Sequence, residues 1–92
     1  MQTVTYKIPG GKLLRLKTEV KDGKLFKPQL SGDFFLMPPE KLPLLEAALD
    51  NWDLGACDLL ESSLNALLLQ ENILLSGIDA KAIADVVRQV KQ

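Results

Sequence analysis

The sequence predicts an α+β fold in which a small antiparallel sheet of three to four strands, formed by roughly the first 36 residues, is covered on one face by three helices. Two observations support this fold class. Residues 3–8 and 13–20 are rich in β-branched, aromatic and apolar residues, which favours strands. Beyond residue 39, apolar residues recur at helical spacing instead.

Turn signals divide the strand-rich half into hairpins. Pro9-Gly10-Gly11 predicts a tight turn after the first strand, because glycine tolerates the positive φ that such a turn needs. Residues 13–20 alternate between apolar and polar, which predicts one buried and one solvated face. Asp22-Gly23 then closes a hairpin into a strand that runs to about residue 31. Pro28 lacks an amide donor, so we expect this strand to be at an edge or bulged.

The remaining elements are a short fourth strand and three helices. Phe34 to Leu36 continue the extended chain until Pro38-Pro39 ends it. The first helix begins near Pro39 and tolerates Pro43 in its first turn. The last helix is capped by Asp79 and carries a single apolar stripe.

The second helix, predicted at residues 58–73, is apolar on two sides. Such a helix is either sandwiched within the domain or docked against another chain. The two stripes consist of Leu60, Leu64, Leu67 and Leu68, and of Leu59, Ala66, Leu69 and Ile73.

Composition and net charge exclude several classes of function. The chain has 92 residues, which predicts a single domain over residues 1–92, and its net charge of −1 gives no field that would gather nucleic acid. It contains no histidine and a single cysteine, which excludes internal disulfides and the usual zinc sites or catalytic triads. No apolar run is long enough to span a membrane, and no leader pattern is present, so we expect a cytoplasmic protein without metal or membrane partners.

The first turn and the strand after it form the first candidate site. Two interpretations are open for Gly10, Gly11 and Lys12: a plain hairpin turn, or a turn that faces a partner or phosphate ligand. A true phosphate loop would need a helix after the glycines. Arg15 adds charge on the solvated strand face. The basic residues of this half, which outnumber Glu19 and Asp22, favour an acidic partner or a phosphate-bearing ligand. They are Lys7, Lys12, Arg15, Lys17, Lys21, Lys24 and Lys27.

The corner at residues 32–35 forms the second candidate site. We expect Asp33 to act as a structural corner residue whose carboxylate accepts backbone amides, rather than as an acid or metal ligand. Phe34 and Phe35 alternate if they lie on a strand, so one packs in the core and the other points outward, toward a partner. Cys57 is read as a small buried hydrophobe, with a reactive thiol as the alternative.

Three runs in this order resemble the C-terminal accessory domain of lipoate–protein ligases. They are Lys7-Ile8-Pro9-Gly10-Gly11-Lys12-Leu13-Leu14-Arg15-Leu16, then Leu30-Ser31-Gly32-Asp33-Phe34-Phe35-Leu36, then Pro39-Glu40 opening a helix with Leu45-Glu46-Ala47-Ala48-Leu49. A weaker match continues at Ser76-Gly77-Ile78-Asp79. Pro43 and the two-striped helix depart from the family pattern.

The resemblance implies a stand-alone accessory subunit with a fold similar to that of sulfur-acceptor and iron–sulfur scaffold proteins. In such a two-part ligase, a separate catalytic subunit activates lipoate with ATP and Mg to lipoyl-AMP and transfers it to lipoyl acceptor domains. The accessory part holds no cofactor or catalytic residue of its own. The family's catalytic motif contains adjacent arginines and a glycine-rich stretch, and this sequence has neither adjacent arginines nor a triple glycine. The alternatives are a sulfur-relay acceptor that uses Cys57 and a non-catalytic interaction module.

Overall fold

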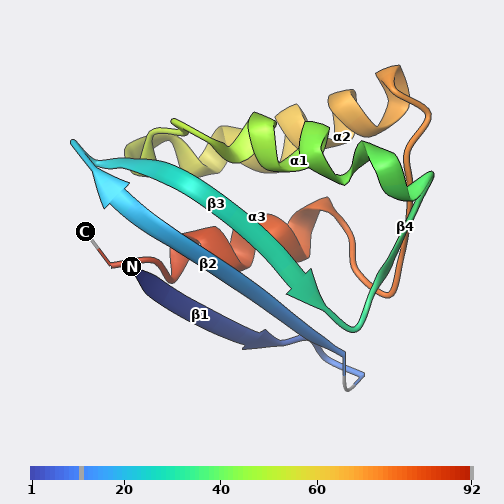
Figure 1. The fold of residues 1–92 in the computed structure, drawn as a ribbon, viewed down its shortest axis with the longest axis horizontal. Coiled ribbons are helices and arrows are strands. Elements are labelled where there is room, and N and C mark those ends of the chain that lie inside the picture. Colours follow the sequence, from blue (N-terminus) through green and yellow to red (C-terminus); the bar gives the residue numbers. More distant parts are fainter. Residues whose placement is uncertain (11, 92) are drawn as a thin grey trace.

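Residues 1–10 and 12–91 are described by a computed structural model, in which a three-stranded antiparallel sheet lies beside a group of helices (Figure 1). Strands β1 (Gln2–Lys7) and β3 (Lys24–Gly32) flank the central strand β2 (Leu13–Lys21). Gly10 and Gly23 both adopt positive φ in the connections, where the sequence predicts turns. Because β1 pairs with β2 and β2 pairs with β3, the three strands form an antiparallel meander.

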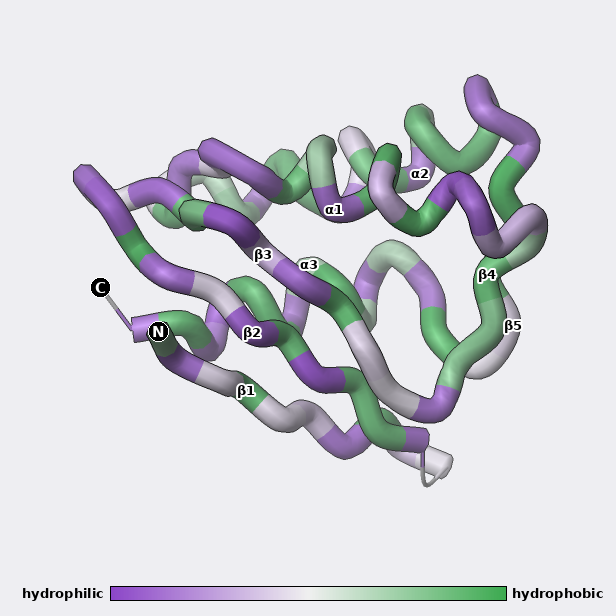
Figure 2. The backbone as a smooth tube through the Cα atoms, in the orientation of Figure 1, coloured by the Kyte–Doolittle hydropathy of each residue, from purple (hydrophilic) through white to green (hydrophobic). Residues whose placement is uncertain are grey.

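The central strand separates a buried face from a solvated face. Leu14, Leu16 and Thr18 have no exposed surface, whereas Arg15 and Lys17 between them are exposed. Figure 2 shows the same alternation as a change of colour along this strand. The buried Thr18 hydroxyl donates to the carbonyl oxygen of Phe26 at 3.1 Å, so its burial leaves no polar atom without a partner. The predicted alternation is confirmed.

A bulge interrupts the pairing of β2 with β3. Lys17 lies opposite Gln29 and Glu19 lies opposite Phe26, so Thr18 faces two residues of β3, Lys27 and Pro28. Lys27 adopts a positive φ of 54° at this point. A bulge of this kind leaves one residue out of the ladder, which suits a proline without an amide donor. The predicted edge position and bulge at Pro28 are both confirmed.

The helices cover the buried face of the sheet and one of its edges. Helix α3 (Ala80–Arg88) lies behind the sheet, α1 (Leu42–Leu49) runs along the side of β3, and α2 (Leu60–Gln70) lies behind α1 and packs against α3 (Figure 1). Short 3-10 turns, η1 (Pro39–Lys41) and η2 (Leu54–Leu59), lead into α1 and α2. Their buried residues join the sheet in one hydrophobic core.

The first and last predicted helices are present, although α1 begins at Leu42, after the 3-10 turn η1, and not near Pro39. Pro43 lies in the first turn of α1, and the Asp79 carboxylate caps α3 by accepting the amide of Ala82 at 2.8 Å. The second helix is shorter than predicted, because Asn72 adopts a positive φ of 54° just after it. Ile73, which we assigned to this helix, is buried beyond its end. That part of the prediction is wrong.

The fourth strand belongs to a second sheet. Strand β4 (Phe35–Met37) pairs antiparallel with β5 (Leu74–Ser76), a strand that the sequence analysis did not foresee. Leu36 pairs with Leu75, and the Leu36 side chain is buried in the core. The α+β class, with an N-terminal antiparallel sheet and three helices, is confirmed; the two-stranded sheet is an addition to it.

The β3 edge of the large sheet is closed by the segment around α1. The Glu46 carboxylate accepts the amide of Leu30 at 2.9 Å, and the Asp50 carboxylate accepts the amide of Lys27 at 3.0 Å. Leu25 exchanges backbone hydrogen bonds with Asn51 and Trp52. Edge amides that would otherwise be open to another strand are thus satisfied internally. No helix in the described part of the chain is long and apolar enough to cross a membrane.

Candidate functional site

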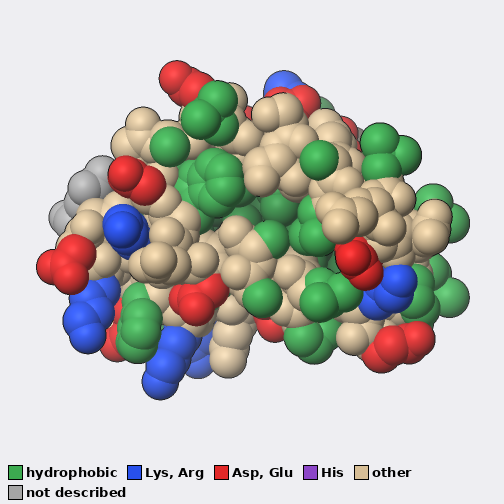
Figure 3. Space-filling view, turned by 90° about the horizontal axis from the view of Figure 1, so that it is seen from above, with side chains coloured by type: hydrophobic (Ala, Val, Ile, Leu, Met, Phe, Trp, Pro, Cys, Tyr) green, Lys and Arg blue, Asp and Glu red, His purple; other side chains and the backbone are tan. Residues whose placement is uncertain are grey.

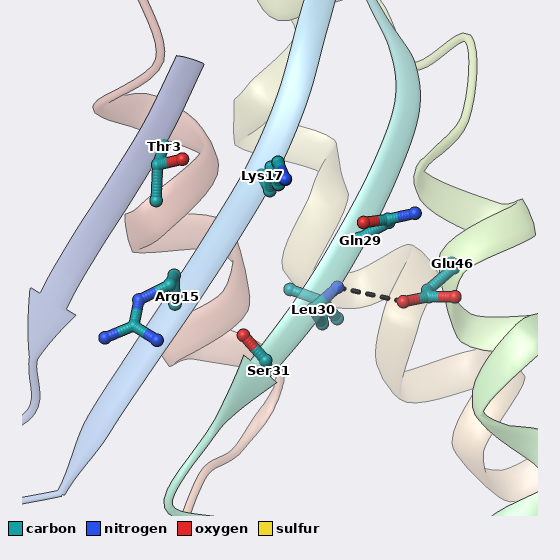
Figure 4. Close-up of a pocket in the computed structure, with 7 residues that line it drawn as sticks. All are labelled: Thr3, Arg15, Lys17, Gln29, Leu30, Ser31 and Glu46. Carbon is teal, nitrogen blue, oxygen red and sulfur yellow. Dashed lines mark hydrogen bonds between the residues drawn. The ribbon is translucent and has the colours of Figure 1, made fainter. Parts of the chain in front are cut away.

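The outer face of the large sheet carries a shallow polar hollow of about 470 Å³ (Figure 4). Its charged centre is supplied by β2, where Arg15 lies opposite Ser31 of β3 and Lys17 lies opposite Gln29. Thr3 of β1 pairs with Lys17 from the other side. Strand alternation places all these side chains on the face that the helices leave uncovered. The full lining is Thr3, Arg15, Lys17, Gln29, Leu30, Ser31 and Glu46.

The hollow has an excess of positive charge. Neither Arg15 nor Lys17 forms an ion pair with any residue in the ranges 1–10 and 12–91. The carboxylate in the hollow, Glu46, accepts the Leu30 amide, as the dashed line in Figure 4 shows. Two free cations beside the hydroxyl groups of Thr3 and Ser31 can hold a carboxylate or phosphate group of a bound molecule.

The first turn is a hairpin connection between β1 and β2. The amide of Ile8 donates to the carbonyl of Lys12 at 2.8 Å, and Gly10 has a φ of 105° with open space around it. Since the turn leads into a strand, it lacks the helix N-terminus that a phosphate loop uses. Lys12 is exposed beside it, and the predicted Gly11 lies outside the described residues. Whether the turn contacts a partner stays a prediction.

The corner after β3 depends on the backbone of Gly32 and Asp33. Gly32 has a φ of 139°, and a Cβ atom there would lie 2.2 Å from the carbonyl oxygen of Leu13. The Asp33 amide donates to that same carbonyl at 2.8 Å. The Asp33 carboxylate itself is exposed and accepts no hydrogen bond from the described residues. A corner exists as predicted. Its contacts among the described residues are those of the main chain, so the predicted role of the carboxylate is not confirmed.

The two aromatic residues that follow the corner point to opposite sides. Phe34 is half-buried and packs against the core, whereas Phe35 is largely exposed. This division matches the alternation that the sequence predicts. Phe34 also lies close to Gly77, where an added Cβ would come within 3.5 Å of the Phe34 Cα atom. The corner therefore packs against the segment that leads into α3.

The structure brings most of the predicted site residues to one end of the molecule. The Asp33 amide donates to the carbonyl oxygen of Leu13, the residue after Lys12, so the corner and the first turn are neighbours, as Figure 1 shows. Arg15 lies farther along β2, in the polar hollow. Phe35 belongs instead to the outer face of the small sheet.

Two sets of residues were not predicted from the sequence as sites. Within the hollow, Thr3 and Gln29 were not singled out, and Ser31 and Glu46 appeared only within the runs that carry the family resemblance, because the proximity of these residues depends on strand register. Lys17 was noted only as one of several basic residues. Beside Phe35, the exposed residues Met37 and Leu74 were also missed, although the period-two spacing of Phe35 and Met37 was visible.

Cys57 is buried within η2, and its thiol lies 3.3 Å from the carbonyl oxygen of Leu54. Burial raises the pKa of the Cys57 thiol above its ordinary value; nearby Arg88 opposes this shift, and the carboxylates of Asp58 and Asp53 add to it. A persulfide carrier needs an accessible thiolate, which this environment disfavours. The buried, inert interpretation is supported, and the sulfur-relay alternative is weakened.

Comparison with known proteins places this fold beside a lipoylation component. The structure matches a chain from the archaeal lipoylation system of Thermoplasma acidophilum, described as a bi-partite lipoate protein ligase and its E2 lipoyl domain, with a TM-score of 0.75. The match covers 98% of this chain and 97% of that chain, at 17% sequence identity. At that identity the likeness establishes the fold. No protein-family model and no curated protein matches the sequence.

Proposed function

We propose that this chain is the accessory subunit of a two-part lipoate–protein ligase, needed when a separate catalytic subunit activates lipoate to lipoyl-AMP. The observation that carries the proposal is the match, over nearly the full length of both chains, to a chain from a system described as a bi-partite lipoate protein ligase. The sequence resemblance around the first turn and the Gly32 corner supports the same assignment independently.

The proposed role is to complete a site rather than to catalyse. ATP, lipoate and Mg bind in the complex with the catalytic subunit, and this chain supplies charge at the boundary. Lys12 is exposed beside the first turn, and Arg15 lies in the polar hollow without an ion-pair partner among the described residues. Positive groups in that position stabilise an acidic partner surface or the triphosphate.

The proposal includes a cytoplasmic location, because the reaction consumes ATP and modifies lipoyl acceptor domains. Those acceptor domains are indirect partners that meet this chain through the catalytic subunit.

The two half-reactions test this role. Mixed with the catalytic subunit of a lipoate–protein ligase from the same organism, the chain should restore lipoate-dependent pyrophosphate release from ATP. Transfer of lipoate from preformed lipoyl-AMP to a lipoyl domain should proceed almost equally well without it. The difference is expected because adenylation stabilises charge that develops on the α-phosphate in a water-excluded site, whereas lipoyl-AMP is already activated.

The controls are the chain alone and the catalytic subunit alone. Neither should release pyrophosphate at the rate of the mixture. Equal dependence of both half-reactions on this chain, or dependence of neither, would overturn the accessory role.

A further inference from the structure

The small sheet presents an apolar outer face. Phe35 and Met37 are two residues apart on β4, so their side chains share a face, and Met37 pairs with Leu74 of β5. Their exposed fractions are 75%, 54% and 73%, respectively. Figure 2 shows β4 coloured hydrophobic along its length. These three side chains therefore form a continuous apolar surface.

The apolar surface extends onto the C-terminal end of α2. Leu69, which is 82% exposed, lines a hollow of about 500 Å³ together with Leu74. The other lining residues are Asn65, Leu68, Asn72 and Ile73. Figure 3 shows hydrophobic side chains gathered at the right-hand end of the molecule, where Figure 1 places β4 and the end of α2. We call Phe35, Met37, Leu69 and Leu74 the apolar patch.

The chemistry of the patch is that of an interface core. None of the described residues that line the hollow is charged, and two of them are asparagines, which offer hydrogen bonds to a partner. Lys41, the last residue of η1, forms an ion pair with Glu71, which follows α2 and precedes the lining residue Asn72. An apolar centre with a polar rim is the arrangement found where proteins dock.

The size of the patch favours a larger partner over a second copy. Four side chains exposed to this degree present roughly 500 Å² of surface. Two copies joined through the patch alone would bury roughly 1,000 Å² in total, which is less than the ~1,200 Å² at which stable interfaces begin. A stable complex buries about 800 Å² on each side, so the patch supplies more than half as its apolar core, and a larger partner covers the polar residues around it as well.

We infer that the apolar patch is the surface through which this chain binds the catalytic subunit of the ligase, against an apolar surface of that subunit. The inference rests on the proposed function and adds the location of the interface. It separates two roles in the molecule. The patch supplies binding affinity, and the polar hollow and first turn supply charge.

The test is a binding titration of the catalytic subunit with three forms of this chain: the parent, Phe35→Ser/Leu74→Ser, and Leu59→Ser. Leu59 is a matched control, because it is also a leucine with 63% exposure but lies just before the opposite end of α2 from Leu69. The double variant should raise Kd by about 100-fold, as expected for hot-spot residues, and the control should leave Kd unchanged. Circular dichroism and thermal melting verify that all three forms are folded.

Each other outcome has a distinct meaning. If the parent binds and supports adenylation while the double variant binds equally well, the interface lies elsewhere and the accessory role stands. If the parent neither binds nor supports adenylation, the proposed function fails and this inference fails with it. A parent that sediments as a dimer, with a double variant that sediments as a monomer and no binding by either to the catalytic subunit, would assign the patch to a second copy and overturn the inference.

Discussion

The two sheets of this protein are both antiparallel and both pack their inner faces on the same core, yet their outer faces differ in chemistry. The outer face of the large sheet carries Arg15, Lys17 and neighbouring hydroxyl and amide groups. The outer face of the small sheet carries Phe35, Met37 and Leu74. The outer face of the large sheet is polar and suited to contact with water, whereas the outer face of the small sheet is apolar.

This difference between the outer faces distinguishes residues that folding requires from residues that are available for binding. A sheet with one solvated face needs polar residues there, so the large sheet follows from folding alone. In β4 the inward Leu36 anchors the small sheet to the core, and Phe35 and Met37 add little to folding because they remain exposed. Outward apolar residues that do not stabilise the fold are best explained by a partner.

The largest expected effect is at the corner that joins the two sheets. Gly32→Val should reduce the free energy of unfolding by about 3 kcal/mol or more, because the new side chain meets the Leu13 carbonyl in a backbone region that tolerates little but glycine. Gly10→Val is the matched control: it also strains a positive φ, of 105°, but meets open space, so it should cost only about 1–2 kcal/mol. Denaturant unfolding measures both. Equal losses would show that the close contact at the corner is unimportant.

The next largest effect distinguishes the two faces of the small sheet. Leu36→Ala should cost about 2–4 kcal/mol, because it empties a core position. Phe35→Ala should cost less than about 0.5 kcal/mol, because its side chain already lies in water. Thermal and denaturant unfolding of the two variants provide the comparison. If Phe35→Ala proved as destabilising as Leu36→Ala, the outer face would belong to the fold, and the contrast between the sheets would fail.

A small effect on stability is also expected on the polar face of the large sheet. Lys12→Glu/Arg15→Glu should change the free energy of unfolding by less than about 1 kcal/mol, because both side chains are exposed. The same double variant should lower the rate of adenylation in the complex by reversing charge at the boundary. Lys81→Glu/Lys91→Glu, with the same change in net charge at exposed positions outside the sheet, is the control. Unchanged complex formation and adenylation in the first variant would count against a role for the basic face.

Local sequence determined much of this architecture. The alternation in β2, the turns at Gly10 and Gly23, the bulge at Pro28 and the cap at Asp79 were all predictable, because each depends on residues close together in the chain. The opposite orientations of Phe34 and Phe35 follow from the same alternation. Burial of Cys57 agrees with its ordinary behaviour as a small hydrophobe.

Tertiary structure decided the features that join distant segments. Pairing of β4 with β5 links residues 37 to 41 positions apart, and the pattern of a three-residue strand is too short to indicate its partner. The same pairing places Met37 beside Leu74, and thus creates the apolar patch. The polar hollow arises from strand register and from Glu46 of α1, which reaches the β3 edge. Local periodicity specifies which face of an element is apolar, but only the packing of all elements determines which apolar faces remain uncovered.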